Sequence, residues 1–339
     1  MTSRLCLLAA AITRIAFAQA AEQHQITNIF EPLGTPARDI HRLANFTNII
    51  CAVIFVVVAS LLTYTLIRFR CRSNDHDEEP PQIYGSNQIE TAWTVIPILI
   101  VFVLLGVTAR IVAEVQEKAP PKNALKATVI GHQWWWELKY PGLGITTANE
   151  LNIPAVDASR SNPTFLDLES ADVAHSFWVP QLAGKTDVIP SRRNVMWIDP
   201  STPGTYLGNC TEYCGTQHAN MYVRVVVLSK DDFSKWVSAQ QQPAAADPQT
   251  EQARDLFLSL SCVNCHTVTG TAAKGHSGPD LTHLMSRQTI ASGMLLNNRE
   301  QLRAWIKDPQ QLKPGNLMPN MQLTDKEIDQ VVSYLLTLK

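Results

Sequence analysis

The chain lacks an excess of charge of either sign, because its 28 lysines and arginines nearly balance its 30 aspartates and glutamates. A protein that grips nucleic acid by its phosphates needs a basic face, and a formal net charge of -2 provides none. Nucleic acid is therefore excluded as a partner. The length of 339 residues allows two or three modest domains.

Charged residues are also missing from two long apolar runs near the N-terminus. Leu43 to Ile67 is free of charge, and its 25 residues would span roughly 37 Å as a helix, more than the hydrocarbon core of a membrane. Thr91 to Ala109 is a second such run, in which Pro97 would kink a membrane helix without forbidding it. Neither run repeats polar residues at the helical period, which excludes a helix of a soluble core. The sequence predicts a transmembrane hairpin over residues 21–118.

The first twenty residues have the features of a secretory signal. Arg4 is a short basic start, Leu5 to Ala11 is apolar, and Ala18-Gln19-Ala20 is a small-residue cleavage site. A disordered leader is the alternative. Lysine and arginine counts do not decide the orientation of the hairpin, but a cleaved signal sends the mature N-terminus outward. We therefore expect a protein of the bacterial inner membrane, with everything after Arg110 on the periplasmic side.

Residues 119–237 change to short runs rich in valine, isoleucine, threonine and aromatics, separated by turns such as Pro141-Gly142. This pattern predicts an all-β sandwich or barrel. Four of the predicted strands are Lys126 to Ile130, Thr164 to Leu168, Asn194 to Ile198 and Tyr222 to Leu228.

The last part of the chain returns to helical spacing. Residues 238–250 are polar and unpatterned, which is typical of a linker, and residues 251–339 are predicted to be all-α. Thr324 and Glu327 form a capping box at the start of the final helix. The apolar face expected for that helix consists of Ile328, Val331, Val332, Leu335 and Leu336.

Four of the seven cysteines form two close pairs, Cys210 with Cys214 and Cys262 with Cys265. Two short-range pairs in different surroundings indicate two metal or cofactor sites rather than a disulfide framework.

The first pair belongs to a twelve-residue segment with four soft donors, which suit copper rather than magnesium or calcium. These donors are Cys210, Cys214, His218 and Met221. Gly215 allows the chain to double back, and His175 can supply a second nitrogen. A zinc site or a chance cluster is the alternative, although zinc has no use for a thioether.

This loop, the hairpin, Gly131 to Trp136 and Asp172 to Pro180 together resemble cytochrome c oxidase subunit 2, from about Asn28 to Ser229. The resemblance implies a cupredoxin-like domain that holds CuA, a dinuclear copper centre. All five ligand side chains are present, whereas the equivalent subunit of quinol oxidases resembles this fold but lacks them.

The same resemblance implies a role for each residue of the copper loop. Cys210 and Cys214 would bridge both coppers, and His175 and Met221 would complete one of them. The other copper would take His218 and the backbone carbonyl of Glu212, whose carboxylate would also meet a magnesium shared with subunit 1.

The second pair is part of Cys262-Val-Asn-Cys265-His266, the attachment motif of a covalent haem c. A thioredoxin-like redox pair is the alternative, but it lacks the adjacent histidine. Residues 251–339 resemble a class I cytochrome c, in which Met318, followed by proline, would be the second axial ligand. Met321 competes for that role because it lies on the same loop. Histidine and methionine ligation raises the potential of the iron.

Two further residues acquire roles only through the resemblance. Glu90, at the start of the second span, would stand at the entrance of a proton path into subunit 1, although an acid there is usually just solvated. Trp134 would accept electrons from soluble cytochrome c, although it could be a core aromatic and a tethered haem could replace it.

These features predict subunit 2 of a haem-copper cytochrome c oxidase, which relays electrons from cytochrome c through haem c and CuA to haem a in subunit 1. Oxygen would be reduced to water there, with proton translocation, so this chain carries no catalytic residue of that step. We expect subunits 1 and 3 as partners, and cytochrome c or an upstream complex as donor. A nitric oxide reductase subunit and a free-standing membrane-tethered carrier are the alternatives.

Overall fold

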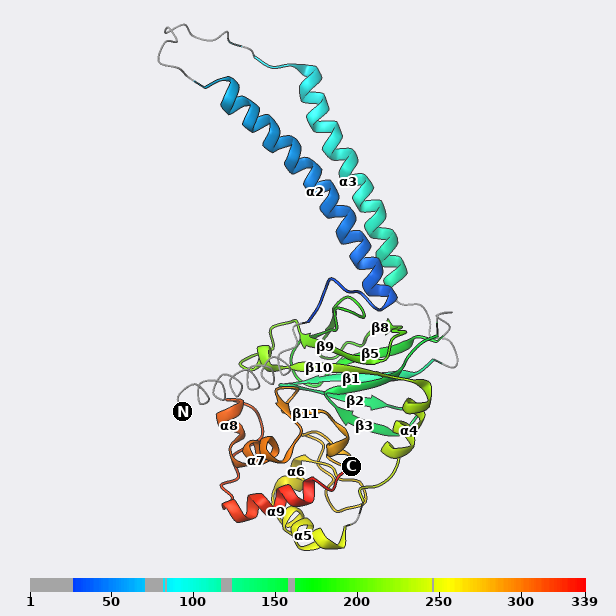
Figure 1. Ribbon diagram of the computed structural model, residues 1–339, viewed down its shortest axis with the longest axis vertical. Coiled ribbons are helices and arrows are strands. Elements are labelled where there is room, and N and C mark those ends of the chain that lie inside the picture. The colour runs from blue at the N-terminus through cyan, green and yellow to red at the C-terminus, as the bar shows by residue number, and fades with distance from the viewer. Residues whose placement is uncertain (1–26, 71–81, 83, 117–123, 158–161, 246) are drawn as a thin grey trace, which may run out of the picture. The chain divides into compact units, whose positions relative to one another are not determined.

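The computed structural model describes residues 27–70, 82, 84–116, 124–157, 162–245 and 247–339 (Figure 1). The two long helices form one unit and the remaining described residues form another, and each unit is considered by itself. The predicted signal, residues 1–20, lies outside the described residues.

The first unit contains α2 (Thr35–Arg68) and α3 (Asn87–Val115), each long and apolar enough to cross a membrane. Both helices are longer than the uncharged runs, because polar residues at their ends continue the helical hydrogen bonding. In the most apolar stretch of each helix no side chain is buried, and Phe55, for example, is 72% exposed. An apolar surface of this extent is stable against lipid rather than water.

The second unit begins with a β domain of two five-stranded sheets. The first sheet has the order β3-β2-β1-β5-β8, and the second has the order β4-β10-β9-β6-β7. The strands of the first sheet are β1 (Lys126–His132), β2 (Trp135–Tyr140), β3 (Ile145–Ala148), β5 (Thr164–Ser170) and β8 (Asn194–Ile198). Those of the second are β4 (Glu150–Pro154), β6 (His175–Trp178), β7 (Thr186–Val188), β9 (Gly204–Cys210) and β10 (Tyr222–Leu228). The predicted sandwich is confirmed.

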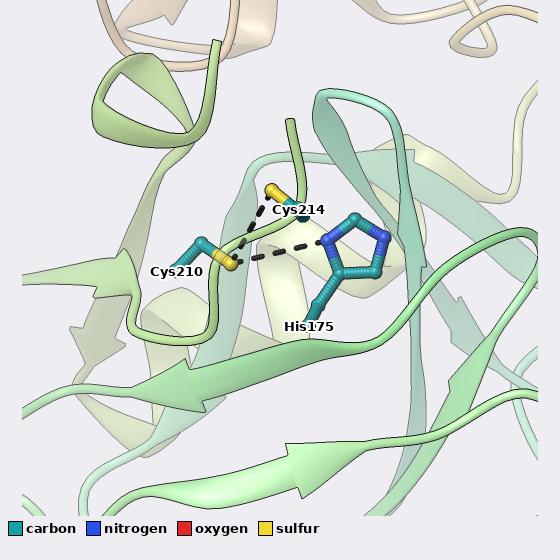
Figure 2. A group of neighbouring side chains, drawn as sticks. All are labelled: His175, Cys210 and Cys214. Carbon is teal, nitrogen blue, oxygen red and sulfur yellow. Dashed lines mark hydrogen bonds between the residues drawn. The ribbon is translucent and has the colours of Figure 1, made fainter. Parts of the chain in front are cut away.

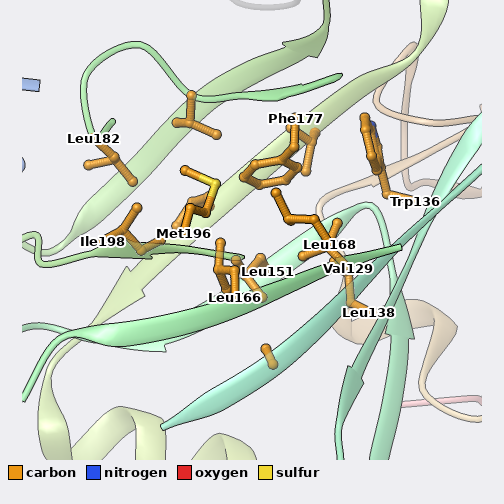
Figure 3. Packing of buried hydrophobic residues seen from close by; sticks show 14 of the residues in the cluster. Val129, Trp136, Leu138, Leu151, Leu166, Leu168, Phe177, Leu182, Met196 and Ile198 are labelled. Atoms are coloured by element: carbon orange, nitrogen blue, oxygen red, sulfur yellow. The ribbon is translucent and has the colours of Figure 1, made fainter. Parts of the chain in front are cut away.

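Apolar side chains from both sheets fill the space between them (Figure 3). Leu166 and Leu168 on β5 are fully buried, whereas Asp167 between them is not, as expected where successive side chains face opposite sides of a strand. Phe177 on β6 packs edge-on against Trp136 on β2, with ring centroids 5.5 Å apart. Burying each such side chain contributes roughly 1.5–3 kcal/mol, so the sandwich is a rigid support for the loops at its ends.

A helical domain follows the sandwich and has its own apolar core. Its elements are η2 (Pro248–Thr250), α5 (Glu251–Ser259), α6 (Cys262–Cys265), η3 (Leu284–Ser286), β11 (Thr289–Ile290), β12 (Leu295–Leu296), α7 (Arg299–Lys307), α8 (Pro309–Leu312) and α9 (Asp325–Leu335). The capping box of Thr324 and Glu327 is present at the start of α9. The predicted apolar face of α9 is buried except for Leu336, which is only partly covered because it follows the last helical residue.

The connection between the two domains is partly ordered by contacts of its backbone. α4 (Lys230–Gln240) extends into the predicted linker, residues 238–250. Beyond it, the Gln242 carbonyl accepts a hydrogen bond from His283 at 2.9 Å, and the Ala244 N–H donates to the Thr269 carbonyl at 3.1 Å. The domain boundaries at residues 118, 237 and 250 stay predictions.

Candidate copper and haem sites

The predicted copper loop connects the end of β9 to the start of β10. Cys210 is the last residue of β9, and the loop contains η1 (His218–Asn220) before β10 begins at Tyr222. Gly215 has a φ of +116° and lies so close to Trp134 that an added Cβ would be 3.0 Å from its ring. The glycine therefore permits the left-handed turn and the close approach that fold the loop back on itself.

The structure brings all five predicted ligand side chains together. The Sγ atoms of Cys210 and Cys214 are 3.8 Å apart, and His175 Nδ1 lies 3.9 Å from the Cys210 sulfur (Figure 2). His218 Nδ1 is 3.6 Å and Met221 Sδ is 3.9 Å from the Cys214 sulfur. These donors come from β6, β9 and the loop, so strand pairing assembles a site whose members are far apart in sequence.

Backbone and side chain of Glu212 face different surroundings. The carbonyl of Glu212 lies 3.3 Å from the Cys210 sulfur and so belongs to the same group of donors. The residue itself is exposed, and within the described residues the potential metal-binding cluster of histidine, cysteine and acidic groups contains only His175, Cys210 and Cys214. A magnesium at the Glu212 carboxylate would therefore need ligands from another chain.

His175 is oriented by Asp172, a residue that the motif contained but to which the sequence analysis assigned no role. The carboxylate of Asp172 accepts a hydrogen bond from His175 Nε2 at 2.8 Å, which leaves Nδ1 with its lone pair toward the sulfurs. Burial alone would raise the pKa of Asp172, but the hydrogen bonds from His175 and from two backbone N–H groups lower it. An acid three residues before a ligand histidine was the signal in the sequence.

The two thiols of the loop hold their protons unequally. The contact with Cys214, and secondarily that with His175, lowers the pKa of Cys210 far below its ordinary value despite burial. The same contact, together with burial, raises the pKa of Cys214. Two thiolates this close repel each other, so both can be deprotonated only if a cation lies between them. The donor set therefore fits a metal held by both sulfurs, and the thioether of Met221 favours copper.

The haem attachment residues line a cavity of about 380 Å³ whose walls come mostly from the helical domain and partly from the β domain. The cysteines of α6 occupy one wall, and His266 follows them directly. His266 Nδ1 donates a hydrogen bond to the Pro279 carbonyl at 2.8 Å, which leaves Nε2 free to bind an iron. Burial lowers the pKa of His266, so the ring is neutral, as a metal ligand must be. Gly278 belongs to the same support, because an added Cβ would be 2.7 Å from the imidazole. These residues fit a haem.

Met318 and Met321 both line this cavity, so proximity alone does not separate the two candidates for the second axial ligand. The loop around Met318 is the better fixed of the two. Gln310 Nε2 donates to the Met318 carbonyl at 2.7 Å, and the Met318 N–H donates to the Asn316 side chain at 2.8 Å. These bonds fix the backbone at Met318, and its assignment as the axial ligand stays a prediction.

Trp134 lies between the two sites. It lines the haem cavity together with Gln133, and it is only 9% exposed. Its indole N–H donates to the Cys214 carbonyl at 3.0 Å, and Gln133 Nε2 donates to the same carbonyl at 2.7 Å. Trp134 therefore connects the cavity wall to the backbone of a copper-loop cysteine.

Glu90 lies in the first turn of α3, after the N-cap Ser86, and so belongs to the helical unit rather than to either metal site. Its role at a proton path stays a prediction.

Comparison with known proteins assigns each part of the chain to a family. Residues 23–109 match the transmembrane domain of cytochrome c oxidase subunit II, and residues 149–228 match its periplasmic domain. Residues 250–339 match cytochrome c.

Two relatives align along most of the chain. Cytochrome c oxidase subunit 2 of Alkalihalophilus pseudofirmus is 35% identical over 318 residues, which are 91% of this chain and 90% of that protein. The subunit of Bacillus subtilis is 30% identical over 329 residues, 91% of each chain. The crystal structure of the periplasmic domain of subunit II of the Bradyrhizobium japonicum oxidase is 28% identical, with a TM-score of 0.33, and covers 36% of this chain and 96% of that one. Similarity to the first two proteins extends from the membrane helices through the cytochrome domain, and the chain therefore belongs to the cytochrome c oxidase subunit 2 family.

Proposed function

We propose that this subunit relays electrons from cytochrome c, through a covalently bound haem c and the dinuclear CuA centre, to haem a in subunit 1. Oxygen is reduced to water in subunit 1, with proton translocation. The observation that carries the proposal is the gathering of five soft donor side chains next to Trp134, which also lines the haem cavity. The relatives named cytochrome c oxidase subunit 2 support it.

In this proposal Cys210 and Cys214 would hold both coppers. His175 and Met221 would complete one copper, and His218 and the Glu212 carbonyl would complete the other. The copper pair would supply one-electron transfer. The chain contributes rigidity: strands β6 and β9 fix His175 against Cys210, and Asp172 fixes the ring.

Cys262 and Cys265 would attach the haem, and His266 and Met318 would hold its iron. The group would supply one-electron chemistry, and ligation by a histidine and a methionine would raise its potential. The Pro279 carbonyl holds His266 in the tautomer that binds iron.

The membrane location implies contacts with the other oxidase subunits. We place the copper and haem domains on the periplasmic side of the bacterial inner membrane, with subunits 1 and 3 as neighbours. Glu212 would share a magnesium with subunit 1, and Glu90 would stand at the entrance of its proton path. An upstream cytochrome c delivers electrons to the haem.

Optical and electron paramagnetic resonance spectra of the purified, metal-loaded protein test the proposal. We expect the spectrum of a covalent haem c together with the hyperfine pattern of an electron shared equally by two coppers. Binding of a single zinc in place of that pattern would overturn the proposal. Turnover with oxygen rather than nitric oxide separates the oxidase from a reductase.

A further inference from the structure

Lys313, at the end of α8 in the haem domain, is buried against the copper domain. It is 3% exposed, and its ammonium donates to the carbonyls of Trp134 and Asn220, each at 2.9 Å. A third, longer contact at 3.5 Å joins it to Ala291 of its own domain. Two of the three acceptors of this lysine are therefore supplied by the other domain.

These acceptors lie beside the copper loop. Asn220 immediately precedes Met221, and Trp134 donates to the carbonyl of Cys214. Lys313 thus hydrogen-bonds to two residues that adjoin copper donors, Trp134 and Asn220, and is not a copper donor itself. The sequence analysis gave this lysine no role, because nothing in a local pattern distinguishes a lysine that crosses a domain interface.

Glu150 on β4 makes the complementary contact from the copper domain. It is 2% exposed, and its carboxylate accepts hydrogen bonds from the backbone N–H groups of Gln288 and Thr289, at 2.9 and 2.8 Å, and from the Thr289 hydroxyl at 2.7 Å. All three donors belong to the haem domain. Each domain therefore inserts at least one buried ionisable group into hydrogen-bonding partners of the other.

A buried charged group whose hydrogen-bonding partners lie across an interface favours the one arrangement of the two domains in which it meets those partners. Its effect is on the choice of arrangement more than on the strength of the contact. Any other docked pose would leave Lys313 or Glu150 buried without its partners, which is strongly unfavourable. A backbone hydrogen bond forms in the same docked arrangement. The Tyr222 N–H of the copper domain donates to the Ser292 carbonyl of the haem domain at 3.2 Å. The same pose covers Trp134.

We propose that Lys313 and Glu150 are positioning residues that hold the haem domain in one docked arrangement on the copper domain. In this arrangement Trp134 is enclosed between the two domains. The inference rests on the proposed function of the two sites. The haem domain is then a fixed part of the relay and not a shuttle on a tether. A soluble donor meets the haem domain and does not reach Trp134.

The test uses the full-length, metal-loaded protein and compares wild type with Lys313→Met and Glu150→Gln. Lys326→Met is the matched control, because Lys326 is an exposed lysine on α9 of the same domain. Hydrogen exchange at the amides of Tyr222, Gln288 and Thr289 reports docking directly. We expect protection at these amides to fall about tenfold in each variant, the effect of losing a hydrogen bond to a charged group, and not in the control.

Electron transfer between haem and copper after photoreduction provides the second measurement. In wild type the rate should not depend on ionic strength, since buried contacts are weakly screened. In both variants it should fall by about tenfold to a hundredfold, as small displacements of reacting groups do, and become salt-dependent, with the copper spectrum unchanged. If Lys313→Met does not fold, Glu150→Gln still allows the electron-transfer rate and its salt dependence to be measured.

Salt-dependent transfer in wild type, or wild-type protection and rates in both variants, would overturn the inference. The proposed function would survive either result, because it depends on the haem and copper spectra. Loss of the shared-copper pattern in wild type would defeat the proposed function instead.

Discussion

The copper loop and the haem cavity differ in how closely the fold itself brings their donor groups together. The copper donors lie within 3.3–3.9 Å of their neighbours, on strands and a loop supported by a two-sheet core. The haem donors instead line a cavity of about 380 Å³, between a four-residue helix and a loop that carries two methionines. One site is assembled by the scaffold, and the other is a space that the cofactor completes.

This difference has a thermodynamic consequence. A scaffold whose core is filled by its own side chains remains folded whether or not a metal binds at its end. A domain whose interior is shaped around a large apolar cofactor relies on that cofactor for part of its buried contacts, so binding contributes to folding. The two sites should therefore respond differently to loss of their ligands.

The largest effect is expected from Cys214→Ser, which removes one of the two bridging sulfurs. The shared-copper hyperfine pattern should disappear completely, while the haem absorption and the fold of the sandwich remain. Electron paramagnetic resonance and circular dichroism measure the two outcomes. Cys51→Ser, which changes an exposed cysteine of α2 in the helical unit, is the control and should leave both spectra unchanged. A persisting two-copper pattern in Cys214→Ser would break the comparison.

Loss of haem attachment should have the next largest effect and a different character. In the double variant Cys262→Ala, Cys265→Ala, the cavity loses its covalent cofactor, so residues 251–339 should be cleaved much faster by protease than in wild type. The copper spectrum of the same variant serves as the internal control and should be retained. Equal protease resistance in variant and wild type would show that the haem domain is preassembled like the sandwich.

Substitution of each of the two methionines tests which one binds the haem iron. Met318→Leu should abolish the absorption that reports methionine bound to haem iron and lower the reduction potential, because a thioether ligand raises it. Met321→Leu should leave both nearly unchanged. The opposite pair of results would assign the axial position to Met321.

A smaller effect concerns the competition between protons and copper at His175. Burial alone lowers the pKa of His175, but the Asp172 carboxylate and the Cys210 sulfur raise it above the ordinary value. A raised pKa means that protonation displaces the metal already at a higher pH as the solution is acidified. Asp172→Asn should lower this pKa in the metal-free protein, which a pH titration of the His175 imidazole measures. Asp187→Asn, at an exposed position on β7, should not shift the titration.

The smallest effect is expected at the capping box of α9. Thr324→Ala removes the side chain that accepts the Glu327 N–H, and should destabilise the haem domain by about 1 kcal/mol in a denaturant titration. Thr324→Ser keeps the hydroxyl and should stay close to wild type. An equal loss in both variants would mean that the threonine methyl group, rather than the cap, is the stabilising element.

The sequence by itself determined those features that depend on neighbouring residues. Uncharged runs predicted α2 and α3, and Thr324 with Glu327 predicted the start of α9. Short runs rich in valine, isoleucine, threonine and aromatics, separated by turns, predicted the sandwich and four of its strands. Both cysteine pairs could be interpreted from spacing, because thiols three or four residues apart lie close together when the chain turns or coils between them. His175 could be offered as a second nitrogen donor, and the resemblance of its motif supported that choice.

Tertiary structure decided which distant groups meet. Pairing of β6 with β9 brings His175 to Cys210, and the fold of residues 172–175 directs Asp172 at the imidazole. The docking of two domains encloses Trp134 and buries Lys313 and Glu150, three residues that would be ordinary in isolation. Local patterns report backbone preference and burial, whereas partners far apart in sequence are chosen by how the whole chain packs. For this reason the donors of the two metal sites could be named in advance, and the interface that joins the sites could not.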